Sequence, residues 1–203
     1  MPFRNDDSRW GQASITLHWL TFALVTCAAV LGLTMGDLPL GLAKLKVYAL
    51  HKSLGLTVLA LTALRLLWRL TGRVPRALPG APRWQAVLAS ATHGALYFLL
   101  LAVPLTGWRY NSVSGFPLQW FGMLRLPALG ATDLAAKHAA KDWHELLFYA
   151  LATLVAVHAV AALGHHYFWR DDTLRRMWFR RAALTAPPLA TPAAPPPAQD
   201  TLP

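Results

Sequence analysis

Five histidines fall within or at the ends of long apolar stretches of this 203-residue chain: His18, His51, His93, His144 and His158. Ionisable side chains at membrane depth are energetically costly, and they usually have a function. One such histidine taken alone is more often a hydrogen-bonding residue between helices than a ligand. Their relative depths and helix faces therefore decide what chemistry they support.

The spacing of His144 and His158 places two imidazoles on one helix face. They are 14 residues apart, which is about 21 Å along a helix axis and close to four full turns. His51 lies at the depth of His144, whereas His18 and His93 both lie at the depth of His158. Neutral imidazoles on opposing helices are what a six-coordinate haem iron needs, and bundle cores often hold such cofactors. The sequence therefore predicts two haems, an outer one at His144 and an inner one at His158.

Three further residues lie 14 positions after a histidine and so share its face: Gly32, Arg65 and Gly107. The glycines fall at the depth of the outer haem, where a larger side chain would block a flat macrocycle; close packing of membrane helices also favours small residues. Arg65 faces the inner haem and is a candidate partner of its propionates. An arginine that snorkels to the inner headgroups would have the same position.

Composition places the chain in a membrane. It is 55% hydrophobic and only 14% charged, which is too apolar for a small soluble globule. Cys27 is the single cysteine, and the chain has no Cys-x-x-Cys-His motif. Any haem would therefore be a haem b, held by coordination and packing rather than by thioether bonds.

Four stretches are long and apolar enough to cross a bilayer, which takes about 20 helical residues. We expect spans at Ile15–Met35, Tyr48–Arg69, Leu88–Tyr110 and His144–Tyr167. Backbone groups in lipid must be satisfied within the chain, so these spans should be helices in an all-α, four-helix transmembrane bundle. We expect residues 1–181 to form this di-haem domain and the Ala/Pro-rich segment 182–203 to be a disordered tail.

Basic residues are distributed unevenly between the two sides of the predicted bundle. Twelve lysines and arginines lie in or next to the N-terminal segment, the second connection and the C-terminal segment, and seven lie in or next to the other two connections. By the positive-inside rule both termini are cytoplasmic. The formal net charge of +10 is therefore interpreted as a solvated basic surface beside membrane spans, and not as a nucleic-acid-binding face.

Short motifs in all four spans resemble those of a known family. They are Ile15-Thr-Leu-His18-Trp19, His51-Lys-Ser-Leu-Gly55, Thr92-His93-Gly-Ala-Leu-Tyr97, Trp143-His144-Glu145 and the run from His158 to Trp169. Their order and depth resemble the bacterial cytochrome b561 family, and within it the superoxide oxidases of the bacterial inner membrane. The wider family includes the haem-carrying membrane subunits of formate dehydrogenases and hydrogenases.

The resemblance implies a ligand set and an electron acceptor. It pairs His18 with His158 at the inner haem and His51 with His144 at the outer haem. His93 is then left near the inner haem, as a candidate residue of a quinone site. Ubiquinone is the acceptor that the resemblance implies.

The outer side carries more cations than the positive-inside trend predicts. Its seven lysines and arginines exceed its four acidic residues by three, and such a field raises the encounter rate with a small anion. Lys52, beside His51, and Arg109 are the residues that we expect to steer superoxide; contact with anionic lipids or haem propionates explains each of them equally well. The first functional prediction is a superoxide:ubiquinone oxidoreductase that oxidises superoxide at the periplasmic side.

Two other classes of function compete with this prediction. An electron-carrier subunit would dock a dehydrogenase, hydrogenase or cytochrome and pass electrons between that partner and quinone. A histidine-lined metal transporter would gather its ligands near the midplane, whereas the histidines here form two layers. The expected partners are thus the lipid bilayer, quinone, and superoxide or a redox protein. His165 and His166, at the inner interface, are expected to contact solvent or headgroups.

Overall fold

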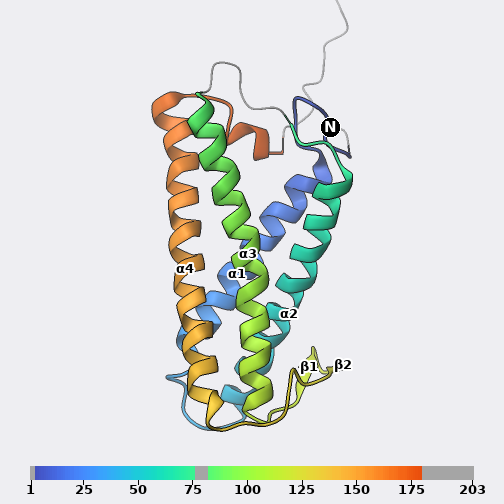
Figure 1. Ribbon diagram of the computed structural model, residues 1–203, viewed down its shortest axis with the longest axis vertical. Coiled ribbons are helices and arrows are strands. Elements are labelled where there is room, and N and C mark those ends of the chain that lie inside the picture. Colours follow the sequence, from blue (N-terminus) through green and yellow to red (C-terminus); the bar gives the residue numbers. More distant parts are fainter. Residues whose placement is uncertain (1–2, 76–81, 180–203) are drawn as a thin grey trace, which may run out of the picture.

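The chain folds as a bundle of four long helices (Figure 1). The structure is a computed structural model, and it describes residues 3–75 and 82–179. The helices are α1 (Gln12–Thr34), α2 (Leu42–Thr71), α3 (Arg83–Val113) and α4 (Ala136–Gly164). In the described part of the chain these four helices are long and apolar enough to cross a membrane. The predicted four-helix membrane bundle is confirmed, and the predicted tail, 182–203, lies outside the described residues.

The helices extend beyond the predicted apolar spans. α2 begins at Leu42 rather than Tyr48, and α4 begins at Ala136 rather than His144. The added turns carry charged side chains, among them Lys141, which a hydropathy argument excludes from a span. Such side chains reach the polar zones on either side of the hydrocarbon, so the helix continues where the apolar stretch has ended.

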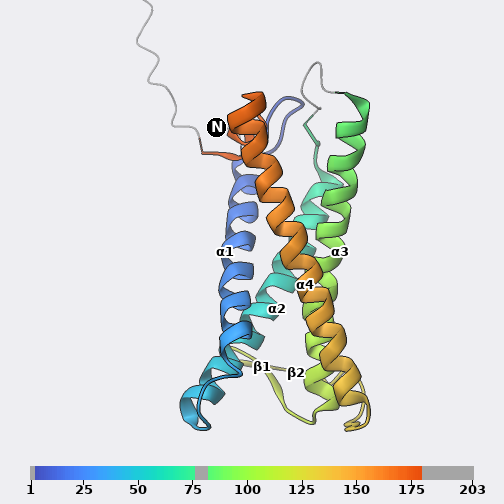
Figure 2. The same ribbon diagram turned by 90° about the vertical axis from the view of Figure 1, so that its left-hand side faces the viewer.

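Helices that follow one another along the chain pack together, α1 on α2, α2 on α3 and α3 on α4. The views in Figures 1 and 2 agree that the start of α1 and the end of α4 lie at the same end of the bundle. We call this the terminal end; it comprises residues 3–11 and 165–179. The opposite end, with the connections 35–41 and 114–135, is called the hairpin end.

Protein packing buries little of the bundle. The central core is a small cluster made of Val58, Leu99, Leu100 and Leu151. Large apolar side chains such as Val160, 68% exposed, point away from it. An apolar surface of this extent marks a membrane-facing molecule, because acyl chains cover the side chains that the bundle leaves open.

The sequence does not predict the short β-hairpin between α3 and α4. Its strands are β1 (Leu118–Trp120) and β2 (Leu124–Leu126), paired antiparallel. Phe121 and Gly122 turn the chain with φ of 49° and 73°, the left-handed conformation that tight hairpin turns require. The N–H of Phe121 donates to the buried Ser53 hydroxyl at 3.0 Å, and Trp120 Nε1 donates to Thr57 Oγ1 at 3.0 Å. Both bonds attach the hairpin to α2.

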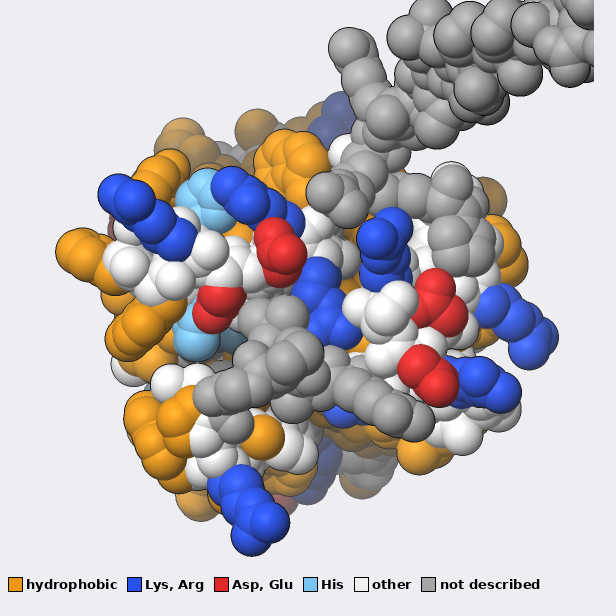
Figure 3. All heavy atoms as spheres, turned by 90° about the horizontal axis from the view of Figure 1, so that it is seen from above, with side chains coloured by type: hydrophobic (Ala, Val, Ile, Leu, Met, Phe, Trp, Pro, Cys, Tyr) orange, Lys and Arg blue, Asp and Glu red, His pale blue; other side chains and the backbone are white. Residues whose placement is uncertain are grey.

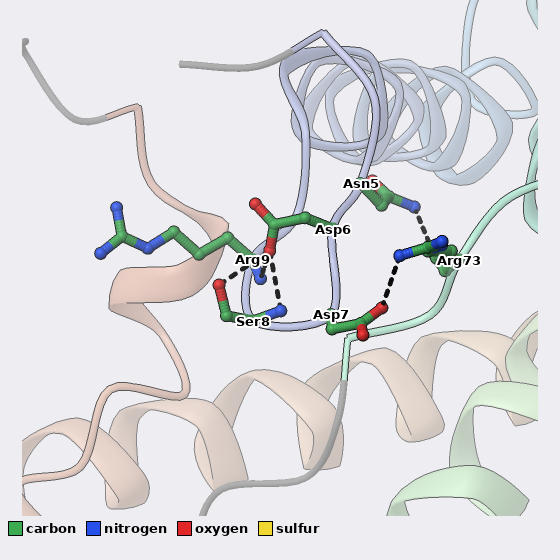
Figure 4. Close-up of polar contacts among 6 residues, drawn as sticks. All are labelled: Asn5, Asp6, Asp7, Ser8, Arg9 and Arg73. Atoms are coloured by element: carbon green, nitrogen blue, oxygen red, sulfur yellow. Dashed lines mark hydrogen bonds and ion pairs between the residues drawn. The ribbon is translucent and has the colours of Figure 1, made fainter.

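Polar contacts hold the N-terminal segment in place at the terminal end, and Figure 4 shows those among residues 5–9 and with Arg73. Hydrogen bonds from the hydroxyl and the N–H of Ser8 lower the pKa of Asp6 below its ordinary value. Asn5 Nδ2 donates to the carbonyl of Arg73 at 3.0 Å, and the Arg73 guanidinium pairs with Asp7 at 3.3 Å. These contacts join the segment before α1 to the end of α2.

The chain after α4 forms the second part of the terminal end. It forms a π-helical turn, η1 (His165–Trp169), and a 3₁₀ turn, η2 (Arg175–Met177). Nδ1 of His165 donates to Asp171 at 2.5 Å, and the His165 side chain is 26% exposed; its predicted contact with solvent or headgroups stays a prediction. Trp19 Nε1 donates to the Met177 carbonyl at 2.8 Å and attaches the segment to α1. Figure 3 looks onto this end and shows lysine and arginine side chains around it, with acidic ones between them.

Candidate functional site

Two pairs of histidines face each other across the bundle, one pair toward each end. His51 on α2 and His144 on α4 have ring centroids 6.4 Å apart and planes at 83°. His18 on α1 and His158 on α4 have centroids 6.4 Å apart and planes at 74°. We call these the hairpin-end pair and the terminal-end pair. α4 contributes one ring to each.

The spacing in both pairs suits one iron held between two imidazoles. Two rings that bind one metal ion through bonds of about 2 Å have centroids roughly 6.3 Å apart. His93 lies nearer to His158, at 5.5 Å, which is too short for ligands on opposite sides of one iron. The distances therefore favour His18 over His93 as the partner of His158.

The surroundings of the pairs suit haem better than a bare metal ion. Among the described residues, no three His, Cys, Asp or Glu side chains converge on a metal site. A bare metal ion usually takes three or four protein ligands. A haem brings four nitrogen ligands of its own, so a histidine pair is sufficient to complete the coordination of its iron.

Main-chain carbonyls hold the hairpin-end pair in one tautomer. His51 Nδ1 lies 2.9 Å from the carbonyl oxygen of Ala28, and His144 Nδ1 lies 3.0 Å from that of Val103. A carbonyl oxygen only accepts, so each Nδ1 must carry the proton and donate it. Nε2 is then left with its lone pair free for a metal, which is the usual arrangement of metal-binding histidines.

Gly32 and Gly107 lie against the rings of the hairpin-end pair. A Cβ atom on Gly32 would be 3.0 Å from Cε1 of His51, and one on Gly107 would be 2.9 Å from Cε1 of His144. The sequence argument gave these glycines the task of clearing space for a macrocycle. That task stays a prediction; in the structure each glycine lies directly against an imidazole ring of the hairpin-end pair.

Arginine side chains surround the terminal-end pair. Arg65 Nη2 lies 3.1 Å from Nδ1 of His18. A guanidinium only donates, so this ring nitrogen accepts and the His18 proton is on Nε2. The guanidinium groups of Arg65 and Arg69 lie 5.5 and 5.8 Å from the centre of the Tyr97 ring. Arg65 is thus beside the terminal-end pair, at the depth that the 14-residue spacing predicts.

A cavity of about 290 Å³ opens beside the terminal-end pair. His93 and Tyr97 line it together with the pair and with both arginines, and residues of the N-terminal and C-terminal segments line its rim. Sequence reasoning missed Arg69 and Tyr97. Arg69 follows Arg65 by four residues and Tyr97 follows His93 by four, the spacing that places two residues on one helix face.

The two cations predicted to steer superoxide both lie at the hairpin end. Lys52 is half-buried, and its Nζ donates to Asn111 Oδ1 at 3.2 Å. Arg109 is exposed, and its Nη1 donates to the Leu129 carbonyl at 3.3 Å. Lys52 therefore ties α2 to the end of α3, whereas Arg109 presents its charge to solvent.

Comparison with known proteins gives one consistent result. A family model described as prokaryotic cytochrome b561 matches residues 9–180. Cytochrome b561 homolog 2 of Escherichia coli (strain K12) is 35% identical over 179 residues, which are 87% of this chain and 95% of that protein. Cytochrome b561 homolog 1 of the same organism is 33% identical, over 86% of this chain and 99% of its own length. A probable superoxide oxidase, CybB, of Yersinia pestis is 29% identical, over 80% of this chain and 92% of its own length.

Proposed function

This chain belongs to the prokaryotic cytochrome b561 family, and from this premise we propose that it is a di-haem superoxide:ubiquinone oxidoreductase of the bacterial inner membrane. Family membership makes it a membrane cytochrome that binds b-type haem and transfers electrons. The number of haems, the electron donor and the acceptor are the parts that we propose. The observation that supports two haems is that α4 contributes one imidazole to each of two pairs, and that the ring centroids in each pair are 6.4 Å apart.

His51 and His144 hold one haem in this proposal, and His18 and His158 hold the other. A bound haem supplies an iron that takes up and releases one electron at a time. The chain supplies the four ligands, sets the tautomers of His51 and His144, and holds the two sites about 21 Å apart along α4. His51 and His144 already have Nε2 free, so the hairpin-end pair needs no change of tautomer to bind iron.

The terminal-end pair requires Arg65 to change partner. An imidazole bound through Nε2 carries its proton on Nδ1, and a protonated Nδ1 cannot accept from a guanidinium. Arg65 must therefore leave His18 when the site is filled. The porphyrin carboxylates are acceptors of the kind that an arginine binds most strongly, so we assign them to Arg65, with Arg69 beside it.

The terminal end faces the cytoplasm in this proposal. The uneven count of lysines and arginines in the sequence supports this orientation, because twelve of the 19 lie in or next to the N-terminal segment, the second connection and the C-terminal segment. The hairpin end then faces the periplasm. The chain is a multi-pass protein of the inner membrane.

We place ubiquinone in the cavity beside the terminal-end pair. His93 is the candidate hydrogen-bonding residue for a quinone oxygen, because it lines the cavity and is too close to His158 to share its iron. Reduction of one ubiquinone to ubiquinol takes two electrons and two protons. Two superoxide anions, each giving up one electron and becoming O₂, therefore balance one quinone.

Superoxide is proposed to meet the protein at the hairpin end. The lysines and arginines of that side exceed its acidic residues by three, and this net positive charge attracts a small anion. Arg109, near the end of α3, has an exposed side chain. Lys52 lies next to His51 in the chain and is half-buried. It contributes charge close to the proposed haem.

An electron-carrier subunit is the second candidate. The observation in its favour is the apolar tip of the hairpin, where Phe121, Met123 and Leu124 are 47%, 83% and 55% exposed. Such a tip suits contact with a redox partner, although it suits the membrane interface as well. The absence of a converging three-ligand site among the described residues gives the transporter no comparable support.

Rapid mixing with superoxide separates these functions. Superoxide added to the purified, quinone-supplemented protein should reduce its haem within the mixing experiment and yield one ubiquinol per two superoxide anions. Arg109→Gln should slow the reaction several-fold at low ionic strength and less at high ionic strength, since salt screens the attraction. Arg175→Gln, at the terminal end, is the matched control. Reduction no faster than that of free haem would contradict superoxide oxidation and favour the carrier.

A further inference from the structure

The imidazole of His51 is held by a particular arrangement on α1. Its Nδ1 donates to the carbonyl of Ala28 at 2.9 Å. Gly32 follows Ala28 by four residues, so its N–H is the helical partner of the same carbonyl. Its missing side chain leaves the space that the ring fills, because a Cβ there would lie 3.0 Å from Cε1 of His51.

The same arrangement recurs on α3 around His144. Nδ1 of His144 donates to the carbonyl of Val103 at 3.0 Å, and Gly107 follows Val103 by four residues. A Cβ on Gly107 would lie 2.9 Å from Cε1 of His144. Thr106 adds a further donor, since its hydroxyl bonds the Val103 carbonyl at 2.8 Å and lies 3.4 Å from Nδ1 of His144.

The terminal-end pair lacks this arrangement. Nδ1 of His18 faces the Arg65 guanidinium, and among the described residues neither His18 nor His158 has a main-chain carbonyl as its hydrogen-bond partner. The two pairs therefore have equal spacing and different electrostatic surroundings. A carbonyl increases the electron density of the ring to which it is bonded, and in the described part of the chain neither ring of the terminal-end pair has such an acceptor.

We infer that Gly32 and Gly107 are positioning residues of the hairpin-end haem, which open a helix carbonyl to the Nδ1–H of a ligand on the facing helix and so lower the reduction potential of that haem below that of the other. The inference rests on the proposal that both pairs bind haem. Normal contacts between carbon atoms are about 3.5–4.0 Å, so any side chain at either glycine pushes the ring away from its carbonyl. The more basic ligands favour the ferric iron at the hairpin end, and an electron that arrives there moves on toward the terminal end.

Redox titration of the haem-loaded protein tests this inference. Gly107→Ala and Gly32→Ala should each raise the potential of the hairpin-end transition and leave the terminal-end transition unchanged. Their affinity for that haem should also fall about 10- to 100-fold, the usual effect of disturbing a hydrogen bond to a metal ligand. Gly94→Ala is the matched control on α3, because a Cβ there meets nothing within 4 Å.

Thr106→Val gives a second test, because this substitution places no new side chain against the ring of His144 and so should leave both haems bound. The hydroxyl competes with His144 for the Val103 carbonyl, so its removal should strengthen the bond from Nδ1 and lower the same potential, with two haems still bound. In Gly107→Ala the new side chain can also obstruct the macrocycle, so that only one haem binds. A lowered hairpin-end potential in Thr106→Val would then still show that the hydrogen bond to the Val103 carbonyl controls this potential. Two haems whose potentials are unaffected by both substitutions would overturn the inference, whereas a protein that binds no haem would overturn the proposed function.

Discussion

His144 shows how much of the site is determined at a single ring. The Val103 carbonyl decides which nitrogen carries the proton, Gly107 provides the space for the ring, and the position on α4 sets its depth. None of these contacts involves a charged partner, which would shift the ring out of its neutral form. The ring therefore has a free Nε2 before any cofactor binds.

Removing this ring should remove one haem and no more. His144→Ala should bind one haem per chain by the pyridine haemochrome assay, because His51 alone does not complete the coordination of iron. His138→Ala, exposed on the same helix, should still bind two.

His93→Ala should also bind two haems, since the 5.5 Å spacing to His158 excludes a shared iron. Loss of one haem in this variant would contradict the pairing of His18 with His158. The comparison thus separates a ligand from a histidine that only lines the cavity.

At the scale of elements, hydrogen bonds attach the segments that flank the bundle to its helices. Residues 3–11 contact α1 and the residues after α2, as Asn5 does through Ser14 and Arg73, and residues 171–179 contact α1 through Trp19. Asp171 organises the second segment: partial burial raises its pKa, but hydrogen bonds from Thr173 and His165 outweigh this, and the net effect lowers the pKa.

A lowered carboxyl pKa makes the order of this segment depend on pH. The stabilisation is fully present above the ordinary aspartate pKa of about 3.9 and is lost as the pH falls through the lower folded-state value. Asp171→Asn should therefore speed amide hydrogen exchange in residues 171–178 at pH 7 by roughly fivefold, which corresponds to about 1 kcal/mol for a partly exposed group. The difference should vanish in strong acid. Asp172→Asn, which removes an exposed pair with Arg175, should have a smaller effect; equal effects would contradict the role of Asp171.

The elements also differ in how far sequence predicts them. The four spans follow from hydropathy alone, and the 14-residue spacing in α4 follows from helix geometry. The hairpin does not, because its strands have three residues each and are held by Ser53 and Thr57 of a distant helix.

The contacts of Gly32 and Gly107 with imidazoles depend on how helices pack. The sequence places each glycine on the face and at the depth of the outer haem. The neighbour that fills the space depends on the approach of α2 to α1 and of α4 to α3, which no periodicity encodes.

At the scale of the molecule, the described part of the bundle has a small apolar core. The buried cluster between its helices consists of Val58, Leu99, Leu100 and Leu151. The remaining apolar surface faces outward, as expected for helices whose solvent is lipid. The predicted architecture and family are therefore recovered from the sequence, while the tautomers of His18, His51 and His144 require the structure.

The depth difference between the two histidine pairs has an electrical consequence. Their separation of about 21 Å is roughly two-thirds of a hydrocarbon layer about 30 Å thick. In the orientation that we propose, an electron that moves from the hairpin-end pair to the terminal-end pair moves toward the negative side of an energised membrane. The work is about 1.5 kcal/mol for each 100 mV of membrane voltage, which changes the distribution of electrons between the two sites about tenfold.

The membrane voltage should therefore lower the rate of electron transfer through this protein. In proteoliposomes with a potassium diffusion potential, a voltage negative on the terminal-end side should slow quinol formation and accumulate electrons at the hairpin-end pair, and the reverse voltage should do the opposite. A rate that does not respond to voltage would mean that the electron does not cross this depth. With such a response, the cell would oxidise superoxide fastest when its membrane is discharged.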